Sequence, residues 1–322
     1  MKVKKRNIVL IFILMFLIFQ VLSIFHAYSF THPVKYSDEW KPKSTKLSLK
    51  QLALVTVFGF KPYSKVNGIL PSDVGLKYEN VSFKSRDGLM LKGLLIKTNK
   101  SKGMIILAHG WEGNKEGLLN YSKFLARNSY EVLIFDFRGF GESEGGYSSL
   151  GYYERFDVLD AIDYIKSRKD LNSDFIGGLG FSMGGASMLM TIKDSQVFDA
   201  LVIDSVYPTI HQNVGRRFNT VYGFPKFPFA TSLVFWGGII NGFNGFDLAP
   251  EKYIAEAKFP IFIIQGTEDY QVSIGDANLL FNKAQEPKQM WIVNGSKHTG
   301  AFLDYPNLYE NKVICFFDTY SK

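Results

Sequence analysis

The chain contains little cysteine or histidine, with one cysteine and five histidines among 322 residues. A single cysteine excludes an internal disulfide framework, and the apolar neighbours of Cys315 predict that it packs within a C-terminal helix. Basic runs interleaved with aromatic residues are absent beyond the amino terminus, where four of the first six residues are Lys or Arg and supply much of the formal charge of +7. Nucleic acid is therefore not an expected partner.

A long hydrophobic run follows the basic amino terminus. Residues 8–25 are apolar except for Gln20 and Ser23, which is close to the length of a helix that crosses a bilayer. We expect residues 1–30 to form a membrane anchor or signal segment. An uncleaved single-pass anchor is favoured, with the preceding basic residues in the cytoplasm and the remaining chain outside it. Secretion after signal cleavage near residues 27–29 is the alternative.

Beyond the apolar run, residues 31–77 predict a polar tether with a short helix at 49–60. From residue 78 onward, short β-rich runs alternate with longer helical stretches, which indicates one α/β domain over 78–322. We expect a mostly parallel, eight-stranded sheet with helices on both faces. The predicted strands are 81–84, 90–97, 104–108, 132–135, 175–180, 200–203, 261–265 and 289–293. The predicted helices are 115–127, 152–167, 183–193, 273–284 and 306–320.

The alternation stops between about residues 207 and 253. This stretch is rich in phenylalanine, glycine and proline, and a long irregular insertion in a compact domain is more often a lid than a plain loop. So many aromatic rings must face the core, a ligand or the bilayer. We expect a lid over the site, with Phe227 and Trp236 contacting an apolar substrate.

A nucleophile motif lies at the end of the predicted strand 175–180. Gly180-Phe181-Ser182-Met183-Gly184 matches G-x-S-x-G and leads directly into a helical stretch. The chemistry requires a tight turn between strand and helix that lifts the serine hydroxyl above the sheet, and the glycines leave room for that turn. The same turn directs the backbone N–H of Met183 toward a reacting carbonyl oxygen.

A serine nucleophile needs a base, and five histidines permit selection by position. His26 lies in or beside the membrane segment, His32 in the tether, and His211 in the predicted lid. His109 follows a strand that comes before the nucleophile motif. His298 follows the last predicted strand in a polar loop, from which a ring can reach the carboxyl edge of the sheet. We therefore expect His298 to be the general base.

The acid that orients the base should follow a strand and precede the histidine in the chain. Asp269 fits this position after strand 261–265, where it would fix the imidazole tautomer. Glu268 is its neighbour in the same loop, and Asp204 follows the strand 200–203. Asp269 is preferred, and Asp204 and Glu268 stay open as alternatives.

The order Ser182, Asp269, His298 resembles that of the α/β-hydrolase superfamily, over about residue 78 to the carboxyl end. His109-Gly110-Trp111 resembles the family's H-G-x segment. That resemblance implies that the backbone N–H groups of Trp111 and Met183 form an oxyanion hole. Residues 136–143 resemble the family's D-x-R-G-x-G-x-S loop, for which a structural role is expected. The general likeness is to bacterial membrane-anchored or secreted hydrolases.

These observations predict a serine hydrolase of carboxylesterase or lipase type that cleaves an ester-like acyl bond in a small-molecule or lipid-like substrate. No metal and no organic cofactor are implied. A peptidase or amidase of the same fold is an alternative that the triad does not separate from an esterase. A non-catalytic, membrane-tethered binding protein on a hydrolase scaffold is another.

Overall fold

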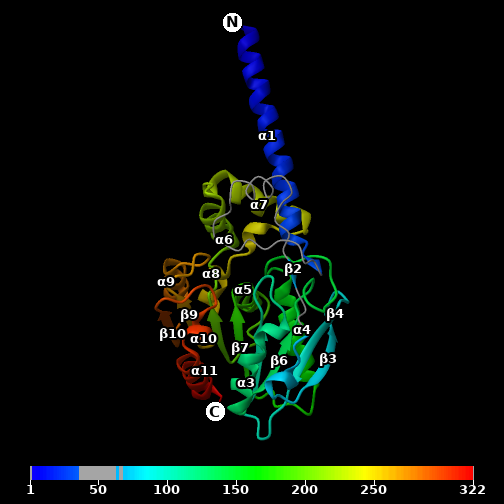
Figure 1. Cartoon of the computed structure of the whole chain (residues 1–322), viewed down its shortest axis with the longest axis vertical. Coiled ribbons are helices and arrows are strands. Elements are labelled where there is room, and N and C mark those ends of the chain that lie inside the picture. The colour runs from blue at the N-terminus through cyan, green and yellow to red at the C-terminus, as the bar shows by residue number, and fades with distance from the viewer. Residues whose placement is uncertain (1, 36–62, 65–67, 322) are drawn as a thin grey trace.

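The computed structural model describes residues 2–35, 63–64 and 68–321. It shows a domain built around one large sheet, from which a long helix projects (Figure 1). The predicted helix at 49–60 and most of the predicted tether lie outside the described residues. Two short strands, β1 (Val34–Lys35) and β2 (Tyr63–Ser64), pair in parallel beside the domain.

The main sheet has eight strands in the order β10-β9-β8-β7-β5-β6-β4-β3. All neighbours run parallel except the pairs β3–β4 and β4–β6, which confirms the mostly parallel sheet predicted from the sequence. The strands are β3 (Glu79–Lys84), β4 (Met90–Ile96), β5 (Met104–Ala108), β6 (Glu131–Phe135), β7 (Ile176–Phe181), β8 (Ala200–Asp204), β9 (Ile261–Gly266) and β10 (Lys288–Val293).

The central strands are apolar along their whole length because helices bury both faces of the sheet. All five residues of β5 are buried, and successive residues belong to different cores: Ile105 to the core beneath α3 and α11, and Ile106 to the core beneath α4 and α5. The covering helices are α3 (Leu119–Arg127), α4 (Glu154–Ser167), α5 (Met183–Met190), α9 (Ile274–Lys283), α10 (Ala301–Asp304) and α11 (Pro306–Tyr320). Cys315 lies in α11 as predicted, but it is exposed rather than packed.

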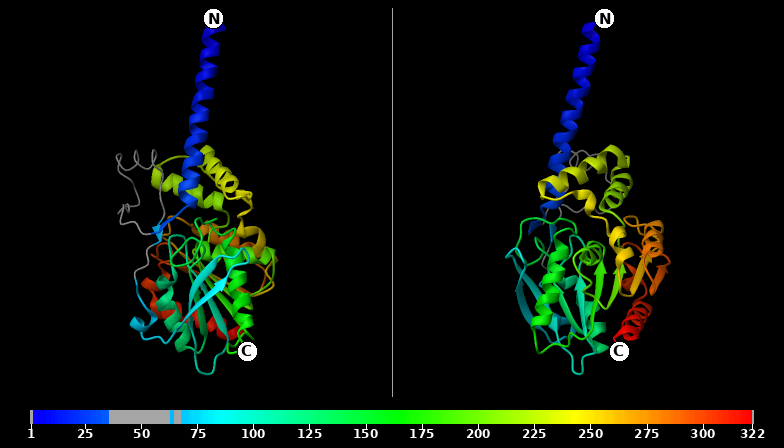
Figure 2. Two further views of the ribbon diagram at one scale, coloured as in Figure 1. Left: turned by 90° about the vertical axis from the view of Figure 1, so that its right-hand side faces the viewer. Right: turned by 180° about the vertical axis from the view of Figure 1, so that it is seen from behind.

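An insertion between β8 and β9 stands above the carboxyl end of the sheet (Figures 1 and 2). Helices α6 (Ile210–Arg217) and α7 (Lys226–Ile240) are joined by a π-helical turn (Phe218–Tyr222) and form its body. Two short elements, η5 (Gly245–Asp247) and α8 (Pro250–Tyr253), lead back toward β9. These helices lie in the stretch from about residue 207 to 253, and a role as a lid stays a prediction.

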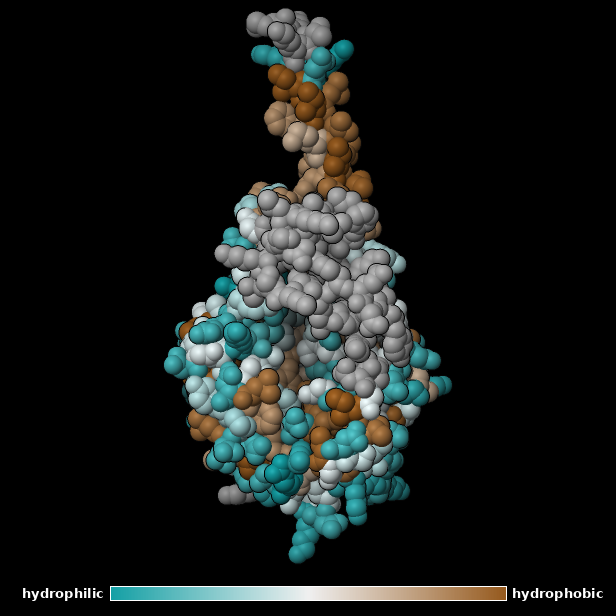
Figure 3. Space-filling view, in the orientation of Figure 1, coloured by the Kyte–Doolittle hydropathy of each residue, from teal (hydrophilic) through white to brown (hydrophobic). Residues whose placement is uncertain are grey.

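The projecting helix is α1 (Lys2–Thr31), which is long and apolar enough to cross a membrane. Its first half is exposed and forms the apolar stalk seen in Figure 3. Its second half packs on α7. There the Trp236 Nε1–H donates to the Gln20 side-chain oxygen at 2.8 Å, and the rings of Phe19 and Phe229 meet edge to face.

Candidate active site

Ser182 lies in the tight turn between β7 and α5. Its backbone has φ 50° and ψ −115°, a positive-φ conformation that few non-glycine residues adopt. The turn is held by its neighbours, since the Ser182 N–H donates to the Asp204 carbonyl at 2.9 Å. A side chain at Gly184 would lie 2.2 Å from the Ala108 carbonyl oxygen, so the helix can approach β5 only with glycine at this position. The turn thus has the strained form expected of a nucleophile motif.

His298 and Asp269 form a close pair. The His298 Nδ1 lies 2.7 Å from the Asp269 Oδ2, and the Asp269 side chain is fully buried. The other carboxylate oxygen of Asp269 accepts from the backbone N–H groups of Gln271 and Val272 at 2.8 and 3.0 Å. Burial opposes ionisation of this carboxyl, but the hydrogen bond and charge of His298 and the two N–H groups outweigh it, so the pKa of Asp269 is lowered.

The two alternative acids have different surroundings. Glu268 is exposed. Asp204 is buried at the end of β8, where its oxygens accept from the hydroxyls of Ser205 at 2.9 Å and Tyr309 at 3.2 Å. Burial raises the pKa of Asp204 to about 6. Of the three candidates, Asp269 is the carboxylate bonded to the His298 ring.

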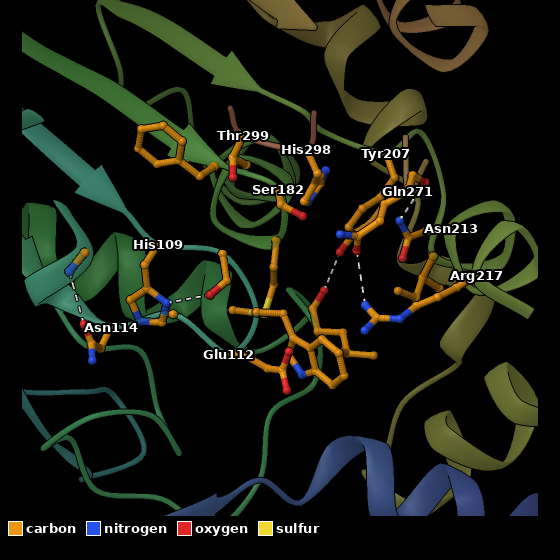
Figure 4. Close-up of a pocket in the computed structure, with 18 of the residues that line it drawn as sticks. His109, Glu112, Asn114, Ser182, Tyr207, Asn213, Arg217, Gln271, His298 and Thr299 are labelled. Atoms are coloured by element: carbon orange, nitrogen blue, oxygen red, sulfur yellow. Dashed lines mark hydrogen bonds between the residues drawn. The ribbon is translucent and has the colours of Figure 1, made fainter. Parts of the chain in front are cut away.

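A cavity of about 560 Å³ lies where these elements meet. Ser182, His298, Trp111 and Met183 all line it, and Asp269 lies behind His298. Figure 4 shows Ser182 and His298 together on one wall of the pocket. Four of the five residues predicted from the sequence to carry the reaction therefore line one cavity. The fifth, Asp269, bonds to His298 from behind.

His109 is buried next to this pocket, and both of its ring nitrogens are engaged. Its Nδ1 lies 2.8 Å from the Gly110 carbonyl oxygen, and its Nε2 accepts from the Phe137 N–H at 3.0 Å. A ring that accepts at Nε2 and donates at Nδ1 is neutral, and burial correspondingly lowers the pKa of His109. His109 therefore ties the loop after β5 to the loop after β6.

The loop at 136–143 is held by a buried carboxylate. Asp136 accepts from the backbone N–H and the ammonium of Lys115, at 2.7 and 2.6 Å, and from the Glu142 N–H at 2.9 Å. Next to it, the Arg138 guanidinium pairs with the buried Asp157 at 2.6 Å. These contacts fit the structural role expected for this loop.

Comparison with known proteins shows which fold and which relatives this chain resembles. Residues 103–234 match the sequence profile of the α/β hydrolase fold family. The uncharacterized protein YfhR of Salmonella typhi is 28% identical over 283 residues, which are 81% of this chain and 87% of that protein. YqkD of Bacillus subtilis is 24% identical over 72% of this chain and 76% of its own length. The solved esterase Pf2001 of Pyrococcus furiosus superposes with a TM-score of 0.70 at 23% identity, covering 81% of this chain and 98% of that one. The chain has the α/β-hydrolase fold.

The two residues that the sequence predicted to contact substrate from a lid do not line the pocket. Phe227 is 75% exposed at the start of α7, and Trp236 faces α1, where it bonds to Gln20. The insertion residues at the pocket come from α6 instead. They are Ile210, Asn213, Val214 and Arg217, and Tyr207 lines the pocket just ahead of α6.

Two of the pocket residues that sequence reasoning missed contact the Trp111 ring. Phe30, at the end of α1, stacks on the Trp111 ring with centroids 5.5 Å apart and planes within 10°. The Arg217 guanidinium lies 4.9 Å from the centroid of the same ring, and its Nη1 donates to the Gln271 side chain at 3.2 Å. Phe30 continues directly from an apolar run that was interpreted only as a membrane segment, and nothing in the sequence relates it to Trp111.

Among the residues that the structure describes, no group of three or more His, Cys, Asp or Glu side chains is arranged to hold a metal ion.

Proposed function

We propose that this chain is a serine hydrolase that cleaves an ester-like acyl bond through an acyl-enzyme on Ser182. The observation that carries the proposal is the 2.7 Å pair of His298 and Asp269 on the same pocket as a serine in a strained turn. The combination of nucleophile, base and orienting acid is the arrangement that nucleophilic acyl transfer requires.

In the proposed reaction, the Ser182 oxygen attacks the carbonyl carbon while the His298 Nε2 takes the hydroxyl proton. Asp269 holds the proton on Nδ1 and so leaves Nε2 free to act as the base. The oxyanion would be stabilised by the backbone N–H groups of Trp111 and Met183, at the positive end of α5. His298 then protonates the leaving alcohol, and a water molecule activated by the same ring releases the acid and restores the Ser182 hydroxyl.

A carboxylesterase-like or lipase-like activity is preferred over peptide or amide cleavage. The similar solved structure from Pyrococcus furiosus is named an esterase. The triad alone serves both reactions, and amide cleavage differs in needing efficient protonation of a poorer leaving group. An enzyme without organic cofactor is proposed, with a small-molecule or lipid-like ester as substrate.

We also propose that α1 is a retained single-pass anchor, with the hydrolase domain outside the cytoplasm. The contacts of α1 support retention, because Ala27 packs in a small core with Phe218 and Leu233 of the insertion. Cleavage near residues 27–29, as in the secreted alternative, would open this core and remove the partner of Trp236.

Covalent labelling tests the proposal directly. A fluorophosphonate probe should label the purified full-length chain at Ser182, and the Ser182→Ala variant should not react. A panel of p-nitrophenyl esters beside aminoacyl p-nitroanilides then separates esterase from amidase activity. A chain that binds no probe and hydrolyses neither panel would be the non-catalytic binding protein.

A further inference from the structure

We propose that Ser205 is a positioning residue that holds the base in a fixed place relative to the nucleophile, a proposal that rests on the proposed function. Ser205 directly follows Asp204, the last residue of β8, and both side chains are buried. Ser205 is not among the described residues that line the reaction pocket, so its influence on the reaction has to pass through its neighbours.

The end of β8 is bonded to the nucleophile turn. The Asp204 carbonyl accepts from the Ser182 N–H at 2.9 Å, and Phe181 pairs with Asp204 in the sheet. On the other side, the Ser205 N–H donates to the Ile264 carbonyl of β9 at 3.0 Å. The backbone at Asp204 and Ser205 is therefore fixed relative to the turn that carries Ser182.

The Ser205 side chain is bonded to the loop that carries the base. Its Oγ accepts from the Thr299 N–H at 3.0 Å, and this N–H belongs to the peptide unit directly after His298. Ser205 has φ 59° and Thr299 has φ 53°, so one hydrogen bond joins two non-glycine residues of positive φ. Such conformations cost free energy and persist where the surroundings impose them. Thr299, His298 and Ser182 all line the reaction pocket (Figure 4).

The Asp204 side chain sets the direction of the Ser205 hydroxyl. One carboxylate oxygen accepts from this hydroxyl at 2.9 Å, and the other accepts from the Tyr309 hydroxyl at 3.2 Å. A hydroxyl has one donor and two acceptor positions, so a Ser205 hydroxyl that donates to Asp204 presents its lone pairs to the Thr299 N–H. Asp204 thus acts on the base loop through Ser205.

The two supports of His298 act on different parts of this residue. Asp269 fixes the ring and its tautomer, whereas Ser205 fixes the peptide unit that follows. Proton transfer requires the ring to lie within hydrogen-bonding reach of the nucleophile hydroxyl, and a displacement of about 1 Å can lower the rate on the order of 100-fold. Loss of the Ser205 hydroxyl should therefore slow the chemical step and leave substrate binding almost unchanged.

The test measures p-nitrophenyl ester hydrolysis by the full-length protein in lipid nanodiscs. Ser205→Ala should lower kcat by about tenfold or more, while KM stays within about twofold of the wild type. The rate of fluorophosphonate labelling should fall with kcat, because both need the base. Ser205→Gly separates the hydroxyl from the backbone, since glycine adopts positive φ without strain, and its kcat should fall as in Ser205→Ala.

Ser122→Ala is the matched control. Ser122 is fully buried like Ser205, and its hydroxyl donates to the Leu118 carbonyl at 3.0 Å. Its kcat and KM should equal those of the wild type, and thermal unfolding verifies that all variants fold. Asp204→Asn should lower kcat on its own but add little to Ser205→Ala, because residues that act through one contact are not additive.

Three outcomes would overturn the positioning role. They are a wild-type kcat in Ser205→Gly, a loss that appears in KM alone, and an equal loss in Ser122→Ala. A full additional loss from Asp204→Asn in the Ser205→Ala background would contradict the route through Ser205. Failure of the proposed function gives a different result, because the wild type would then neither hydrolyse any ester nor be labelled by the fluorophosphonate.

Discussion

The ring of Phe30, at the end of the apolar helix, lies parallel to the ring of Trp111 beside the nucleophile turn, with centroids 5.5 Å apart. Next to it, the Thr31 carbonyl accepts from the Ser148 N–H at 2.7 Å. The first contact joins α1 to the loop that would supply one oxyanion-hole N–H, and the second joins α1 to the loop before α4. From the sequence alone, a chain that starts near residue 36 is expected to be active, because the triad does not need the apolar run. The contacts of Phe30 change that expectation.

Phe30→Ala should lower kcat of the full-length enzyme by about tenfold. Loss of the stacked ring releases Trp111, and a displaced donor weakens oxyanion stabilisation, which can be worth more than this factor in full. The measurement is ester hydrolysis together with the rate of fluorophosphonate labelling, and both should fall. Phe16→Ala serves as the control, since Phe16 is 60% exposed on the same helix. An active, fully labelled chain lacking residues 1–35 would show that α1 does not support the site.

Ser182→Ala and His298→Ala should each lower kcat by roughly 10⁴-fold or more, because the groups act as a unit. The double variant should lose little beyond either single change. Stopped assays with a p-nitrophenyl ester measure these rates, with circular dichroism to verify folding.

Asp269→Asn should lower kcat by up to about 10⁴-fold, because an amide at this position favours the wrong His298 tautomer. Glu268→Gln is the matched control in the same loop and should have little effect. The acid would be misassigned if Asp204→Asn abolished turnover while Asp269→Asn retained it.

Asp204 should make the stability of the fold depend on pH. Because burial raises its pKa from 3.8 to about 6, the native state binds the proton more tightly than the unfolded chain. The contribution of this group to the free energy of unfolding is therefore favourable below about pH 4 and is lost as the pH rises through 6. The difference in free energy of unfolding between Asp204→Asn and the wild type should therefore shift in favour of the variant by on the order of 2–3 kcal/mol between pH 4 and pH 7.

Denaturant unfolding of the full-length protein at several pH values measures this gain. Asp174→Asn, at an exposed aspartate, should follow the wild-type pH dependence. If the free energy of unfolding of Asp204→Asn also follows the wild-type pH dependence, the buried carboxyl does not titrate in this range.

The intact protein should fractionate with membranes and resist extraction by salt or alkaline carbonate, because an apolar span is held by hydrocarbon burial rather than by charge. Protease added to cells with a permeable wall should digest the hydrolase domain, and a cytoplasmic marker protein should survive. Protection of the domain under these conditions would reverse the proposed orientation.

Much of the fold could be predicted because its signals are local. Strands buried on both faces read as continuous apolar runs, so residues 104–108 were predicted with the bounds that β5 has, and the other strands to within about two residues at either end. The turn at Ser182 could be predicted because the motif itself carries the signal: Gly180 and Gly185 approach each other too closely for a side chain on either. The contact of Gly184 with Ala108 of β5, in contrast, is visible only in the fold.

The parts of the site that were missed depend on contacts between distant segments. Phe227 and Phe30 look alike in the sequence, as aromatic residues in apolar surroundings, yet Phe227 points outward and Phe30 lines the pocket. Their difference is set by how α1, α6 and α7 pack, which periodicity along one segment does not encode. Arg217 was overlooked for the same reason, because its partner Trp111 is more than a hundred positions away.

If α1 spans a bilayer, the packing of Gln20 against Trp236 fixes how deep the insertion stands in it. A spanning helix needs about 20 residues to cross the hydrocarbon, and counted from Ile8 these end near Ala27. The part of α1 that contacts α7, from Phe19 onward, thus falls within that thickness. An α1 that spans fully would draw α7 into the outer leaflet, and its outward-facing Phe227, Phe235 and Ile239 would then touch lipid tails instead of water.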